Sequence, residues 1–104
     1  MIYVQLSKGF ATEGTGDFEA HCDLVMEELL RLETVEISDV ELSAELATKI
    51  VTITVVAMAD TFENAITKAD GVIRTAIHAA GGHTPEWQHF IFAPQSQVAN
   101  LVNA

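Results

Sequence analysis

The sequence predicts an α+β domain: a four-stranded antiparallel sheet with two helices on one of its faces. Two observations predict this class. Two stretches repeat hydrophobic residues at the 3.6-residue period of amphipathic helices, residues 18–32 and 60–80. Four stretches instead alternate apolar residues or are dense in β-branched ones, as strands are: residues 1–6, 34–45, 49–58 and 87–92. Along the chain the order is strand, helix, strand, strand, helix, strand.

The strand from Lys49 to Met58 is the clearest of the four, because Val, Ile and Thr dominate it. Successive side chains of a strand point to opposite faces of the sheet. One face is wholly apolar and carries Val51, Ile53, Val55 and Ala57. The other face is mixed and carries Ile50, Thr52, Thr54, Val56 and Met58. We expect the first face to pack against the helices and the second to be open to solvent or to a partner.

The helix that follows has a start signal and a stop signal. Asp60 and Glu63 have the spacing of a capping box, in which each side chain accepts a hydrogen bond from the other's backbone. Gly81-Gly82 supplies a residue that tolerates the left-handed conformation that closes a helix. The apolar stripe between these signals is Phe62, Ala65, Ile66, Ala69, Ile73, Ala76, Ile77 and Ala80. Gly71 lies on the opposite face, where we interpret it as neutral variation.

In the first part of the chain, a strand at Met1–Leu6 leads into a glycine-rich stretch, Ser7–Gly16. We interpret this stretch as a mobile connection rather than a phosphate loop, since no Gly-Lys-Ser/Thr closes it and the acids nearby repel anions. Asp17 is predicted to cap the first helix, whose inner stripe is Phe18, Cys22, Val25, Leu29 and Leu32. Buried in that stripe, Cys22 is predicted to be inert.

The second strand, Thr34–Glu45, is predicted to contain a bulge at Ser38-Asp39 or to start late, and Leu46–Thr48 is short enough for a hairpin turn. Pro85 and Pro94 bound the fourth strand, Trp87–Phe92, as suits an edge. We expect one domain over residues 1–94 and a tail over 95–104 that is a short helix or an arm. The element order is that of the ferredoxin-like fold, which by itself indicates no particular chemistry.

Composition excludes several classes of function. Residues 1–47 hold eleven acidic and two basic residues, and the whole chain has a net charge of −10. Binding to a phosphate backbone needs Lys and Arg, so we expect no direct nucleic-acid binding. No apolar run is long enough to span a bilayer, and no basic segment starts a signal peptide, so we expect no membrane association. The single Cys22 suits a reducing compartment and a cytoplasmic location.

The sequence contains no Ser-His-Asp set, nucleotide fingerprint or paired-carboxylate signature, and we therefore predict that the chain is not an enzyme. Histidines and carboxylates are not spaced as metal ligands usually are, so we predict no metal and no cofactor. One alternative remains open: His78 and His83, at the end of the second helix and in the following loop, with a carboxylate, as a small-ligand or metal site.

Two main hypotheses for the function follow. The first is a small acidic protein-binding module that forms a homodimer through its open sheet face or its edge strand. The second is an inhibitor or nucleic-acid mimic, of the kind that defence systems and phages use, which binds a partner protein with a basic surface. The candidate partner-binding residues are Glu19, Asp23, Leu24, Glu27 and Leu30 on the first helix, Ile50, Val56 and Met58 on the open face, and Trp87 and Phe90 on the fourth strand.

Overall fold

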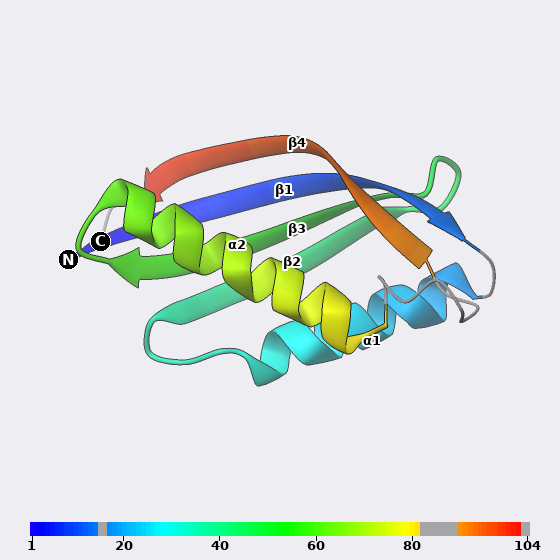
Figure 1. Cartoon of the computed structure of the whole chain (residues 1–104), viewed down its shortest axis with the longest axis horizontal. Coiled ribbons are helices and arrows are strands. Elements are labelled where there is room, and N and C mark those ends of the chain that lie inside the picture. Colours follow the sequence, from blue (N-terminus) through cyan, green and yellow to red (C-terminus); the bar gives the residue numbers. More distant parts are fainter. Residues whose placement is uncertain (15–16, 82–89, 103–104) are drawn as a thin grey trace.

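The computed structural model describes residues 1–14, 17–81 and 90–102, and at Phe90 and Ile91 it describes the backbone alone. The elements are β1 (Ile2–Gly14), α1 (Phe18–Arg31), β2 (Ile37–Glu45), β3 (Ile50–Ala59), α2 (Phe62–Ala79) and β4 (Phe90–Val102). The strands form one antiparallel sheet in the order β2-β3-β1-β4, and both helices lie on the same side of it (Figure 1). The predicted ferredoxin-like α+β class is confirmed. Among the described residues, no helix has the length and hydrophobicity that crossing a bilayer needs.

The core lies between the helices and the inner face of the sheet. Val51, Ile53, Val55 and Ala57 on β3 are fully buried, which confirms the predicted phase of this strand. Helix α1 begins as predicted, because the Asp17 side chain accepts a hydrogen bond from the Ala20 amide at 3.1 Å. Its buried face includes the predicted Phe18, Cys22, Val25 and Leu29, with Leu32 partly buried beyond the last turn, and also His21.

The predicted cap of α2 is wrong by one residue. Thr61, not Asp60, is the N-cap: its backbone is extended, and its side chain accepts a hydrogen bond from the Asn64 amide at 3.1 Å. Asp and Thr are both good caps, and they are adjacent here. The path of the chain out of β3 therefore decides which of them precedes the first helical residue. At the other end, Gly81 adopts the left-handed conformation, with φ of +83°, as predicted.

The glycine-rich stretch Ser7–Gly16 was predicted to be a mobile connection, and that prediction is wrong for Ser7–Gly14, which continue strand β1. Its pairing with β3 stays in register through this stretch, with Lys8 opposite Ile53 and Phe10 opposite Val51. Gly9 is needed for close approach rather than for flexibility. A Cβ built at Gly9 would collide with the Ser96 hydroxyl of the neighbouring strand β4.

This close approach predicts a compensating pair of substitutions. Gly9→Ala is expected to lower the free energy of unfolding by about 1–3 kcal/mol, the usual cost of overpacking. Ser96→Ala removes the hydroxyl, and the next nearest atom, the Ser96 Cβ, is 3.7 Å from the added Cβ. The double variant is therefore expected to recover most of the loss in urea unfolding. Equal losses in the single and double variants would contradict the pairing of Gly9 with Ser96.

The fourth strand was predicted at Trp87–Phe92, with a separate tail from Gln95. Instead, β4 runs from Phe90 to Val102, so the predicted boundary at residue 94 falls inside the strand and the tail is neither a helix nor an arm as far as Val102. Trp87 lies outside the described residues. Gly9 pairs with Ser96 and Phe10 with Pro94, which leaves Gln95 as an extra residue in a bulge. A proline is tolerated there because β4 is an edge strand.

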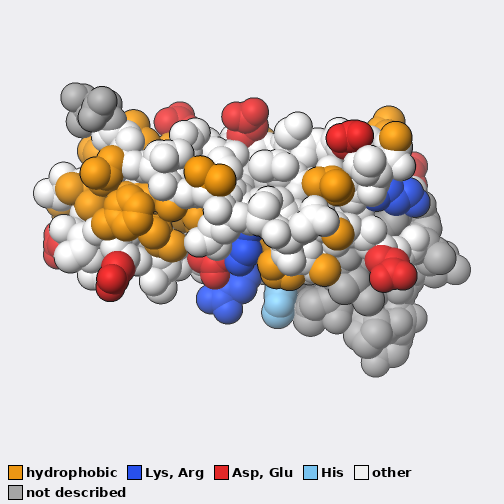
Figure 2. Space-filling model, turned by 90° about the horizontal axis from the view of Figure 1, so that it is seen from above, with side chains coloured by type: hydrophobic (Ala, Val, Ile, Leu, Met, Phe, Trp, Pro, Cys, Tyr) orange, Lys and Arg blue, Asp and Glu red, His pale blue; other side chains and the backbone are white. Residues whose placement is uncertain are grey.

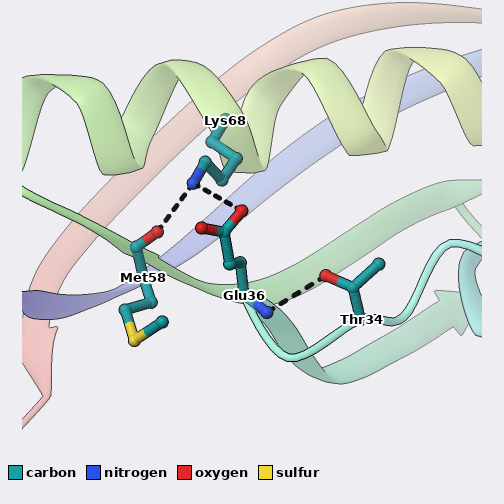
Figure 3. A network of polar contacts seen from close by, with 4 residues as sticks. All are labelled: Thr34, Glu36, Met58 and Lys68. Carbon is teal, nitrogen blue, oxygen red and sulfur yellow. Dashed lines mark hydrogen bonds and ion pairs between the residues drawn. The ribbon is translucent and has the colours of Figure 1, made fainter.

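Strand β2 begins at Ile37, and its register shifts between Ser38 and Glu41, which confirms the predicted bulge. A polar network holds the loop before it (Figure 3). Lys68 on α2 donates hydrogen bonds to the Glu36 carboxylate at 3.1 Å and to the Met58 carbonyl at 2.9 Å. The Glu36 amide donates to the Thr34 hydroxyl at 3.0 Å. The α1–β2 loop is thereby tied to α2 and to β3.

Candidate functional site

The two edges of the sheet differ in charge. Strand β2 carries Asp39, Glu41 and Glu45 along one edge. Strand β4, at the other edge, contains no Asp, Glu, Lys or Arg between Phe90 and Val102. Proteins usually protect an edge strand with charged side chains, because its free backbone groups can pair with another chain. The β2 edge has this protection and the β4 edge does not.

Strand β4 also exposes hydrophobic side chains on both of its faces. Leu101 pairs with the buried Val4 and so lies on the helix side, whereas Val98 pairs with Ser7 and lies on the open side. Both are largely exposed, Leu101 at 61% and Val98 at 57%. Helix α2 packs on β3 and β1 and makes few contacts with β4 (Figure 1). The helix side of β4 is therefore only partly covered: Phe92 and Ala99 pack against the core, whereas Leu101 is exposed.

Hydrophobic side chains gather at the end of the molecule where the chain termini lie (Figure 2). The segments that meet there are the start of β1, the start of α2 and the end of β4. The exposed large hydrophobic residues in and next to these segments are Met1, Tyr3, Phe62, Leu101 and Val102. We define the β4 surface as Val98, Leu101 and Val102 together with the free backbone edge of β4. The local sequence pattern did not indicate this surface, because residues 95–104 read as a tail when strand pairing is unknown.

The open sheet face is less hydrophobic than we predicted. Val56 is only 6% exposed, since it sits between Gln5 on β1 and Ser38 on β2. Ile50 and Met58 are partly buried. In the centre of this face the Ser7 and Thr54 hydroxyl oxygens are 2.8 Å apart and share a hydrogen bond. Trp87 and the Phe90 side chain lie outside the described part, so the structure does not place them on this face.

The predicted acidic row on α1 is exposed. Glu19, Asp23 and Glu27 face solvent, and within the described ranges none of the three forms an ion pair. Leu24 and Leu30 on the same helix are about half exposed. Cys22 is buried beneath the row, and burial, with smaller contributions from Asp23 and Glu19, raises the pKa of its thiol to about 11. The thiol is therefore protonated at neutral pH, which makes Cys22 a poor nucleophile.

A charged group lies between β1 and α2. The Lys8 ammonium, on the helix side of β1, contacts the Asp70 carboxylate at 2.6 Å, and the other carboxylate oxygen contacts Arg74 Nε at 3.2 Å. Lys8 is 14% exposed and Asp70 is 24% exposed. The sequence did not predict this charged group, because Lys8 lies in the glycine-rich stretch that was predicted to be a connection. The alternation Leu6, Lys8, Phe10 was the signal that places Lys8 on the inner face.

An aromatic cluster lies farther along the same face of β1. The rings of Phe10 and Phe92 have centroids 5.7 Å apart, and the ring of His21 on α1 is 5.8 Å from that of Phe92. His21 thus serves the packing of α1 on β4. Among residues 1–14, 17–81 and 90–102, no group of three or more His, Cys, Asp or Glu lies close enough to hold a metal ion.

A cavity of about 400 Å³ opens on the solvent side of α2, and the described part of its lining is Gly71, Arg74, Thr75 and His78. His78 is exposed on the outer face of the helix, as its position in the sequence predicts. His83, its predicted companion, lies outside the described residues. The structure therefore places His78 beside Arg74 and Thr75 and does not test its pairing with His83.

No protein-family model and no curated protein sequence matches this chain. Several solved structures are similar to it in chain path, among them two with the following identities and coverages. One is SnoaB, a cofactor-independent oxygenase from Streptomyces nogalater, with a TM-score of 0.49, 15% identity, and coverage of 100% of this chain and 94% of that one. The other is protein SO0527 from Shewanella oneidensis, with a TM-score of 0.46, 13% identity, and coverage of 97% and 89%. Identities this low concern the fold alone.

This comparison corrects one prediction from the sequence. We predicted that the chain is not an enzyme, because it shows no familiar catalytic motif and no cofactor fingerprint. That prediction is contradicted by SnoaB, a solved protein of similar chain path that is a cofactor-independent oxygenase.

Proposed function

We propose that this protein is a self-associating module that works as a homodimer, with the two copies joined along their β4 strands. The observation that carries the proposal is the β4 surface: an edge strand without a charged residue that exposes Val98 on one face and Leu101 on the other. Such an edge is a template for pairing with another strand. Two-fold symmetry is the commonest arrangement of soluble homo-oligomers.

Charge favours a second copy of this chain at β4. Each copy carries a net charge of −10, so two copies repel each other least when they meet at an uncharged surface. Pairing through β2 would bring Asp39, Glu41 and Glu45 towards the same acids of the partner. Pairing through β4 brings uncharged residues together. Pro94 lacks a backbone donor, so the stretch available for pairing is Gln95–Val102.

Edge-to-edge pairing fits the exposed residues better than face-to-face packing of two sheets. A neighbouring strand places its side chains beside both faces of β4, and so covers Val98 and Leu101 together. Face-to-face packing would cover Val98 and leave Leu101 in water. It would also bury the hydrogen-bonded hydroxyls of Ser7 and Thr54 at the centre of the open face.

Light scattering during size-exclusion chromatography at micromolar concentration tests the proposal. We expect the wild-type protein to have twice the chain mass of 11.3 kDa. Val98→Asp and Leu101→Asp are each expected to shift the mass to that of one chain, because both place a carboxylate in the interface. The matched control is Val35→Asp: Val35 is 91% exposed in the loop between α1 and β2, and this variant is expected to remain a dimer.

The geometry of the contact is tested by Tyr3→Asp, on the open face of β1. Edge pairing predicts that this variant stays dimeric, whereas face-to-face packing predicts that it dissociates. A wild-type mass of 11.3 kDa over the whole concentration range would overturn the dimer. Dissociation of Val35→Asp as readily as of Val98→Asp would overturn the assignment to β4.

A further inference from the structure

The cavity on the solvent side of α2 is lined by hydrogen-bond donors. Gly71, Arg74, Thr75 and His78 follow the spacing i, i+3, i+4, i+7, so they share one face of the helix. The guanidinium, the hydroxyl and the imidazole ring can each donate a hydrogen bond. Blue and pale blue side chains lie together on this part of the surface in Figure 2. This is an unusual combination in a chain with a net charge of −10.

Among the described residues, the ion-paired group beside this face carries a net positive charge. Asp70 has one carboxylate, and both of its oxygens are engaged by cations: Lys8 at 2.6 Å and Arg74 Nε at 3.2 Å. Two cations and one anion leave a surplus of one positive charge. Two other ion pairs among the described residues, Lys68 with Glu36 and Arg31 with Glu28, are balanced one to one. The contact with Asp70 uses Nε of Arg74, so the two terminal nitrogens of the guanidinium lie beyond that contact.

Gly71 leaves space beside these donors. A Cβ added at Gly71 meets no atom within 4 Å, so the glycine is not required by packing against a neighbour. In the middle of a helix, glycine costs about 1 kcal/mol relative to alanine. Packing against a neighbour therefore does not explain why glycine occupies this position. A ligand that fills the open space beside Arg74 and Thr75 would explain it, because a side chain at position 71 would occupy that space.

We propose that this cavity binds a small molecule through a single carboxylate or phosphate group. Arg74 would hold the oxyanion through the ends of its guanidinium, and Thr75 would add a hydroxyl donor from the same helix face. Lys8 would act indirectly, because it shares the charge of Asp70 and so keeps Asp70 from neutralising Arg74. The cavity volume of about 400 Å³ suits a ligand with one ring or a short chain. This proposal is independent of the dimer.

Titration with three probes of similar shape tests the proposal: benzoate, phenyl phosphate and the uncharged benzamide. Binding is followed by nuclear magnetic resonance shifts of the α2 amides. We expect saturable binding of benzoate or phenyl phosphate at millimolar concentration and none of benzamide, and the two anions distinguish carboxylate from phosphate. Arg74→Gln is expected to weaken anion binding roughly tenfold or more, since a charge-assisted hydrogen bond is lost.

Two further variants make the test specific. Arg31→Gln is the matched control, because Arg31 resembles Arg74 in exposure, 71% against 67%, and also pairs with a carboxylate on its own helix. It is expected to bind like the wild type. Gly71→Leu fills the open space and is expected to abolish binding while the melting temperature stays equal or rises. Absence of binding by both anions, equal binding of benzamide, or full affinity in Arg74→Gln would overturn the proposal.

Discussion

Replacing Val55 by aspartate is expected to unfold the protein. Val55 lies at the centre of β3, is fully buried, and pairs with Leu6, which is also fully buried. A carboxylate introduced there would be buried among the hydrophobic residues of the core, at a cost of several kcal/mol. Since small domains are stable by only about 5–15 kcal/mol, we expect this variant to lose its cooperative thermal transition in circular dichroism.

The choice of position within β3 matters for this test. Ile53 is equally buried on the same face, but it pairs with Lys8, whose ammonium could partner an introduced carboxylate. Val55 offers no such compensation. Val35→Asp makes the same chemical change at an exposed site and is expected to melt like the wild type. A soluble Val55→Asp variant with a cooperative transition would show that this face of β3 is not in the core.

Leu29→Ala in α1 is expected to lower the free energy of unfolding by about 2–5 kcal/mol, the usual cost of a cavity in a packed core. Leu29 is fully buried on the face of α1 that packs against α2 and β2. The substitution removes these contacts without adding a polar group. Urea unfolding at one fixed protein concentration measures the loss, because self-association makes stability depend on concentration.

The same helix supplies the controls for Leu29. Leu24 and Leu30 are about half exposed on the outer face of α1. Their replacement by alanine is expected to change the free energy of unfolding by no more than about 0.5 kcal/mol, as is usual at the surface. Equal losses in Leu29→Ala and Leu30→Ala would mean that α1 is rotated about its axis. It would also remove Leu30 from the candidates for binding a partner.

The sequence by itself determined the strand and the helix that bury one regular face, β3 and α1. In β3, the alternation of Val51, Ile53 and Val55 with threonines reports directly which face is buried. In α1, the Asp17 cap and the stripe from Phe18 to Leu29 report the start and the inner face of the helix. These features were predictable because a helix or strand that buries one face carries hydrophobic residues at its own repeat along the sequence, so neighbouring residues are enough to reveal it.

The tertiary structure alone decided where β1 and β4 end. Gly9 and Pro94 are signals of a connection and of a strand end when only neighbouring residues are considered. Both lie inside strands, because β1 and β4 pair over most of their length and a bulge at Gln95 accommodates the proline. The pairing energy comes from residues more than 75 positions apart, and no local pattern reports it.

The candidate sites show the same division. The sequence determined that the chain is strongly acidic and that its last strand lacks charge. Only the strand order β2-β3-β1-β4 decided that the uncharged strand is an edge and that the other edge is acidic. Only the packing of α2 on β1 brought Lys8 to Asp70, 62 residues away, and so left positive charge beside Arg74. Charge and composition are properties of the chain, whereas exposure and pairing are set by the contacts that folding makes.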